Sequence, residues 1–287
     1  MKMDANKEIE IIINRFKSGD YEFTINKVSV LLKKFPNNDM LWNLKGLSLQ
    51  TIGNIKESIQ CFIKSLNINP KNIAAKNNLG NSYKYANQYT LALECFEECI
   101  KKDPNYTAAI VNLANLKVIV NDYEDAIKLY NEVLKSNENI ESVYINLAQS
   151  YQSTKDFKNS SKIIHEGVKK YPNQTKLDKL LSIQTNYLND ETHLKSMLSK
   201  IGNSLNDDQK INLFFAIGKA FEDKKDYSNS YKYYLKGNEL KRKKLKFNIK
   251  EKIKLFNDLK AFFETNDLKG KNISQNKRNV IFVFGLP

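Results

Sequence analysis

Four of the five prolines in this 287-residue chain fall on one 34-residue grid. Pro36, Pro70 and Pro104 are spaced by 34 residues, and Pro172 follows after a further 68. Proline lacks the backbone N–H and disfavours helix in the residue before it, so each of these prolines predicts the end of a helix. A period of this length is typical of a helix–turn–helix unit that stacks on copies of itself to form a solenoid.

Small and large side chains recur in the same register, which we number so that Trp42 stands at position 4. Positions 8 and 20 are small, which predicts close helix contacts at Gly46, Gly80, Ala114 and Ala148, and at Ser58, Ala92, Ala126 and Ser160. Positions 17 and 24 are large and are expected to fill the core: Ile55, Tyr89, Tyr123 and Phe157, then Phe62, Phe96, Tyr130 and Ile164. The steps Asn87-Gln88, Asn121-Asp122 and Lys155-Asp156 predict the turn inside each repeat.

This pattern resembles the tetratricopeptide repeat. The resemblance covers four consecutive repeats over residues 39–172, with fainter copies at 5–38 and 211–244. It implies an all-α protein built as a right-handed superhelical solenoid. We therefore expect five repeats over 5–174, an irregular helical pair over 175–210, and a last repeat with a helical extension over 211–265.

Side-chain amides occupy positions 6 and 9 of the first helices, one helical turn apart. They are Asn78, Asn112 and Asn146 at position 6, and Asn81, Asn115 and Gln149 at position 9. In this repeat the first helices line the inside of the superhelix, so the amides are expected to form a double row along a concave groove. An amide both donates and accepts hydrogen bonds, which suits the backbone of an extended peptide or another protein partner. The alternative is that these amides bond only water or the adjacent helix.

Charge and composition narrow the remaining classes of function. The net charge is +14, and residues 231–279 hold 15 basic against 5 acidic residues, with the densest run at Lys241–Lys246. This run is either a solvated helix face or a site for an anionic ligand, and nucleic acid is disfavoured because no base-reading pattern accompanies it. Cys61, Cys95, Cys99, His165 and His193 show no metal-ligand spacing, and both histidines are expected on the surface. Neither a signal peptide nor an apolar span is present, so we expect a cytoplasmic protein without a membrane span.

The chain changes character after residue 265. Residues 266–279 are polar and predict a linker. Residues 280–287 begin with five apolar residues rich in β-branched and aromatic types, which predicts a buried β-strand that lacks its neighbours here. A strand that runs into a glycine-containing turn is how a phosphate-binding loop opens in an α/β domain. The expectation is thus a solenoid followed by the first strand of a truncated domain.

Two stretches, 215–242 and 281–287, are similar to bacterial tetratricopeptide-repeat sulfotransferases. The resemblance implies that Gly285, Leu286 and Pro287 form the mouth of a loop that binds 3′-phosphoadenylyl sulfate. It also implies that this chain is the N-terminal portion of a longer enzyme and neither catalyses nor binds a cofactor by itself. That enzyme would transfer a sulfuryl group to an acceptor hydroxyl, with protein tyrosine as one candidate. The alternatives are a stand-alone scaffold that binds extended peptides and the repeat region of a glycosyltransferase.

Overall fold

The computed structural model describes residues 2–136, 140–189, 191–245 and 248–265, and all its regular elements are helices. Within these ranges lie fifteen α-helices and one short 3₁₀ helix, so the predicted helical solenoid is confirmed. The predicted linker at 266–279 and strand at 280–287 lie outside the described residues. The first ten helices are α1 (Lys2–Lys17), α2 (Tyr21–Lys34), α3 (Asp39–Thr51), α4 (Ile55–Ile68), α5 (Ile73–Tyr85), α6 (Tyr89–Lys102), α7 (Thr107–Ile119), α8 (Tyr123–Lys135), α9 (Glu141–Ser153) and α10 (Phe157–Lys170).

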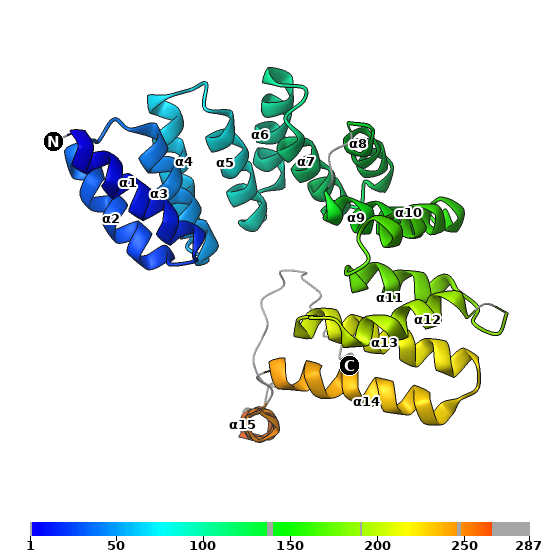
Figure 1. The fold of residues 1–287 in the computed structure, drawn as a ribbon. Helices are drawn as coiled ribbons and strands as arrows, with labels where there is room; N and C mark the ends of the chain where they lie inside the picture. Colours follow the sequence, from blue (N-terminus) through cyan, green and yellow to red (C-terminus); the bar gives the residue numbers. More distant parts are fainter. Residues whose placement is uncertain (1, 137–139, 190, 246–247, 266–287) are drawn as a thin grey trace, which may run out of the picture.

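These ten helices form five successive pairs that follow one another along an arc (Figure 1). Each helix packs on the next one in the chain, and three consecutive pairs of first helices also touch: α3 with α5, α5 with α7, and α7 with α9. Contacts between consecutive first helices place them on the inside of the curve, where the spacing between repeats is smallest. This inner face is the surface on which position 6 and position 9 side chains were expected.

Glycine at position 8 lets the two helices of one repeat approach closely. A Cβ atom on Gly80 would lie only 2.6 Å from the Phe96 ring, and a Cβ on Gly46 would meet the Phe62 ring at the same distance. Phe62 and Phe96 are fully buried at position 24, so the predicted small and large positions are partners in one contact. The neighbour that position 8 touches is therefore the second helix of its own repeat.

A left-handed residue makes the turn inside each regular repeat. Position 15 has a positive φ throughout: Gly19 (87°), Gly53 (85°), Asn87 (58°), Asn121 (62°), Lys155 (62°) and Lys225 (60°). The next residue often caps the second helix, since the Asp156 carboxylate accepts a bond from the Asn159 backbone N–H at 3.1 Å. The turns predicted at Asn87-Gln88, Asn121-Asp122 and Lys155-Asp156 are confirmed.

The chain departs from this pattern after α10. Helix α11 (Thr175–Gln184) has 10 residues, whereas α3, α5, α7 and α9 have 13 each. It is followed by α12 (Thr192–Ser199) and the 3₁₀ helix η1 (Lys200–Gly202), and α11 then packs mainly against α13 (Asp207–Asp223). The pair α13 and α14 (Tyr227–Lys244) restores the regular contact, with Gly218 against Tyr234.

The C-terminal helices leave their charged and apolar residues in solvent. Residues 241–245, which hold most of the basic run, are exposed at the end of α14, where Lys244 pairs with Asp208. Helix α15 (Ile249–Thr265) exposes its apolar side chains, including Phe256 and Leu259. No helix among the described residues combines the length and the hydropathy needed to cross a membrane.

Candidate functional site

The amides of the inner face form hydrogen bonds from one first helix to the next. The Asn78 Nδ2 atom donates to Asn43 Oδ1 at 3.0 Å, which ties α5 to α3. The Asn112 Nδ2 atom donates to Asn77 Oδ1 at 2.9 Å and ties α7 to α5 in the same way. Each bond joins position 5 of one repeat to position 6 of the next. The position 5 asparagines were not predicted to take part, although their 34-residue spacing was visible in the sequence.

The third junction uses a different acceptor because position 5 of α7 is Val111. Here Asn146 Nδ2 donates to Asn115 Oδ1 at 2.8 Å, and the Tyr130 hydroxyl donates to the same oxygen at 2.6 Å. Tyr130 is fully buried, and this burial raises its pKa to about 12. Asn115 therefore satisfies a buried hydroxyl, and its carbonyl oxygen is fully occupied.

The remaining amide groups on this face have hydrogen-bonding capacity that no described residue uses. Within the described residues, the side chains of Asn81 and Gln149 make no hydrogen bond, and the Oδ1 atoms of Asn78, Asn112 and Asn146 accept none. Gln149 is exposed, and the four asparagines are half-buried. The six predicted residues thus share one face. Asn78, Asn112, Asn115 and Asn146 take part in bonds between helices, and Asn115 also accepts from the buried Tyr130 hydroxyl.

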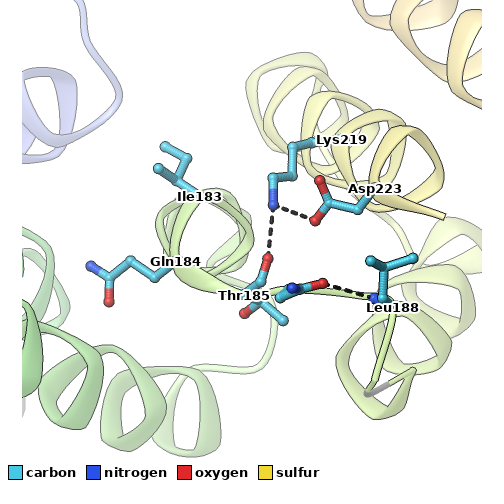
Figure 2. Close-up of a pocket in the computed structure, with 7 residues that line it drawn as sticks. Ile183, Gln184, Thr185, Leu188, Lys219 and Asp223 are labelled. Atoms are coloured by element: carbon cyan, nitrogen blue, oxygen red, sulfur yellow. Dashed lines mark hydrogen bonds and ion pairs between the residues drawn. The ribbon is translucent and has the colours of Figure 1, made fainter. Parts of the chain in front are cut away.

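A shallow hollow of about 400 Å³ opens at the C-terminal end of α11. It is lined by Ile183, Gln184, Thr185, Asn186, Leu188, Lys219 and Asp223. Figure 2 shows Lys219 and Asp223 extending from α13 toward the chain that leaves α11. The Lys219 Nζ atom donates to the Thr185 carbonyl at 2.7 Å and pairs with the Asp223 carboxylate. Ile183 and Lys219 both stand at position 9, like Asn81, Asn115 and Gln149. The sequence register could therefore have predicted that the hollow continues the position 9 row.

A buried charged cluster lies next to this hollow. The Lys200 ammonium contacts both oxygens of Asp178, at 2.7 and 2.8 Å, and Asp178 is fully buried. His193 lies between the Asp178 carboxylate, 3.2 Å from its Nε2 atom, and the Tyr187 hydroxyl, 2.6 Å from its Nδ1 atom. The expected surface position of His193 is therefore wrong, since its side chain is only 10% exposed. His165 is exposed as predicted.

The other predicted sites are more limited. The expected loop residues Gly285, Leu286 and Pro287 lie outside the described residues. The three cysteines are free and buried. In the part of the chain that the structure describes, no group of three or more histidine, cysteine, aspartate or glutamate side chains could hold a metal ion.

Comparisons with known proteins agree with this architecture. Tetratricopeptide-repeat profiles match residues 41–72, 73–106 and 211–244, and no curated protein sequence matches the chain. A tetratricopeptide repeat protein from Parabacteroides merdae has a similar structure, with 16% identity, a TM-score of 0.58, and coverage of 82% of this chain and 92% of that one. The C-terminal part of a repeat protein from Cytophaga hutchinsonii is similar at 13% identity, a TM-score of 0.60, and coverage of 80% and 94%.

MamA from Desulfovibrio magneticus RS-1 is also similar, with 17% identity, a TM-score of 0.53, and coverage of 59% of this chain and 96% of that one. At these identities the likeness concerns the fold, which is a tetratricopeptide-repeat solenoid. Its repeats indicate a protein-interaction scaffold. The sulfotransferase resemblance stays a prediction.

Proposed function

We propose that this chain is an interaction scaffold whose inner face binds an extended peptide segment of a protein partner. The observation that carries this proposal is the set of free amide groups along α5, α7 and α9. An extended peptide presents alternating N–H and C=O groups, and a row of amides offers acceptors and donors to both. The inter-helix bonds hold the side chains of Asn78, Asn112 and Asn146 in place before a ligand arrives, which lowers the entropy lost on binding.

The proposal is tested with a library of random linear peptides displayed on phage and selected on the purified chain. The enriched peptide is then titrated by fluorescence anisotropy into the wild-type protein and into the double variant Asn81→Ala, Gln149→Ala. These two amides make no bond within the described residues, so their removal leaves the helix junctions intact. We expect binding to weaken by about 1–3 kcal/mol with an unchanged melting temperature.

Gln60→Ala is the matched control, because Gln60 is an exposed amide on the second helix α4. It is expected to leave the peptide affinity unchanged. Failure to enrich any peptide, or equal affinity for the double variant and the wild type, would contradict the proposed groove. Replacing Asn112 and Asn146 instead would mix ligand loss with the loss of two helix–helix bonds.

We also propose, from the resemblance in 215–242 and 281–287, that the scaffold presents a partner or an acceptor to a sulfotransferase domain that uses 3′-phosphoadenylyl sulfate. Anion capture by such a loop needs several successive backbone N–H groups and a following helix N-terminus. In this resemblance Gly285, Leu286 and Pro287 would form the mouth of that loop. Calorimetric titration of 3′-phosphoadenylyl sulfate into a protein that joins this chain to such a domain should give saturable heat, and the absence of binding would contradict this proposal.

A further inference from the structure

We infer that the hollow beside α11 is a side-chain pocket for an uncharged, tyrosine-like residue of the bound peptide. This inference rests on the proposed function, because the hollow continues the position 9 row of the inner face. That row runs from Asn115 and Gln149 to Ile183 and then Lys219. A peptide that follows the amides toward the C-terminal repeats therefore reaches this hollow.

The hollow lies where α11 ends. Helix α11 has 10 residues, against the 13 of α9. The chain leaves the helix at Thr185 and puts apolar side chains at the opening. Ile183 is 62% exposed and Leu188 is 59% exposed, so both present apolar surface to a ligand. Covering this surface with an apolar ring is favourable.

The polar floor of the hollow selects a neutral ligand. Lys219 and Asp223 form an ion pair, so the floor carries no net charge and offers no unpaired counter-charge to offset the desolvation of a charged side chain. Asp223 Oδ2 accepts from Lys219 and, at 3.4 Å, from the Tyr187 backbone N–H. Among the described residues, Asp223 Oδ1 accepts no hydrogen bond. A phenol hydroxyl can donate to this oxygen, whereas a phenylalanine ring would leave it without a partner.

The floor is held rigidly before any ligand binds. The Lys219 ammonium lies 5.4 Å from the centre of the Tyr187 ring, and Tyr187 is fully buried. The Tyr187 hydroxyl contacts His193, which contacts the buried pair of Asp178 and Lys200. A pocket whose polar groups are already oriented loses little entropy when it is filled.

The test is an NMR titration of the full chain with N-acetyl-tyrosinamide, observing the methyl signals of Ile183 and Leu188. We expect saturable shifts of both residues, and binding about 3- to 10-fold weaker for N-acetyl-phenylalaninamide, as expected for one lost hydrogen bond. Ile183→Ser should abolish the effect on Leu188. Leu235→Ser, which changes an exposed leucine of α14, is the matched control and should leave it unchanged.

Three results would overturn the inference: no saturable shift, equal affinity for the phenylalanine derivative, or equal affinity for N-acetyl-phosphotyrosinamide. The probes carry no extended backbone, so the Asn81→Ala, Gln149→Ala variant should bind them normally. If the peptide binds but the probes do not, the inference of a side-chain pocket is wrong and the proposed peptide groove stands. If the probes bind but no peptide is enriched, the hollow is a small-ligand site and the proposed peptide groove is wrong.

Discussion

The regular repeats from α3 to α10 and the irregular segment from α11 to η1 solve the same packing problem in different ways. In the regular repeats, a small residue packs against a large one inside a repeat, as Gly80 does against Phe96, and an amide bond joins one first helix to the next. In the irregular segment, a buried pair of Asp178 and Lys200 joins α11 to η1 instead. The first solution is repeated along the arc, whereas the second is used once.

The largest effect is expected from removing the buried ion pair of the irregular segment. Asp178→Ala leaves the Lys200 ammonium buried without its partner, so the free energy of unfolding should fall by about 3–5 kcal/mol. Hydrogen exchange should speed up first in α11, η1 and α13, because each repeat depends mainly on its neighbours. Asp125→Ala, at an exposed ion pair with Lys128, is the control and should have little effect. Wild-type stability of Asp178→Ala in urea unfolding would show that the pair does not hold this segment.

The next largest effect is expected from disturbing the close helix contact inside a regular repeat. Gly80→Ala places a Cβ 2.6 Å from the Phe96 ring, which should destabilise the repeat by about 1–3 kcal/mol through overpacking. Thermal unfolding followed by circular dichroism measures this change. Gly202→Ala is the control in the irregular segment, because no atom lies within 4 Å of the added Cβ and its φ is not in the left-handed region. Equal melting temperatures for the two variants would contradict the close contact.

A smaller effect separates supporting amides from free ones. Asn115→Ala removes the acceptor of the buried Tyr130 hydroxyl, so we expect a loss of about 1–2 kcal/mol in the free energy of unfolding. Asn81→Ala removes an amide that makes no bond within the described residues and should leave stability unchanged. Urea unfolding of both variants decides the matter. A larger loss for Asn81→Ala than for Asn115→Ala would reverse the assignment.

The smallest expected effect tests the left-handed residue in the turn of a regular repeat. Lys155 has a φ of 62°, a region that strains most side chains, so Lys155→Gly should raise the free energy of unfolding by about 0.5–1 kcal/mol. Lys162→Gly inside α10 should instead lower it by about 1 kcal/mol, because glycine weakens a helix interior. The opposite signs of the two melting-temperature shifts are the expected result, and equal signs would contradict it.

Features tied to the 34-residue period could be predicted from the sequence because they depend on local spacing. The turn residues, the small position 8 and the large position 24 all follow from composition at fixed intervals. The rows of amides followed in the same way. Their bonding did not, because whether Asn78 meets Asn43 or a ligand depends on the offset between neighbouring helices.

The irregular segment could not be predicted because nothing in it repeats. Asp178, His193 and Lys200 lie in three different elements, α11, α12 and η1, and single charged residues in a lysine-rich chain are usually exposed. Only the fold brings them together. The hollow beside α11 depends in turn on where that helix ends, and helix ends are the least predictable feature of a sequence pattern.

The amide bonds between first helices also give the solenoid an asymmetric stiffness. They run along the inside of the curve, so opening the arc stretches Asn43–Asn78, Asn77–Asn112 and Asn115–Asn146 before it disturbs the outer helices. The solenoid should therefore resist bending that opens the arc more than bending that closes it. A ligand that binds the amides of several first helices adds further hydrogen bonds between repeats. Resistance to bending should therefore increase with the occupancy of the groove.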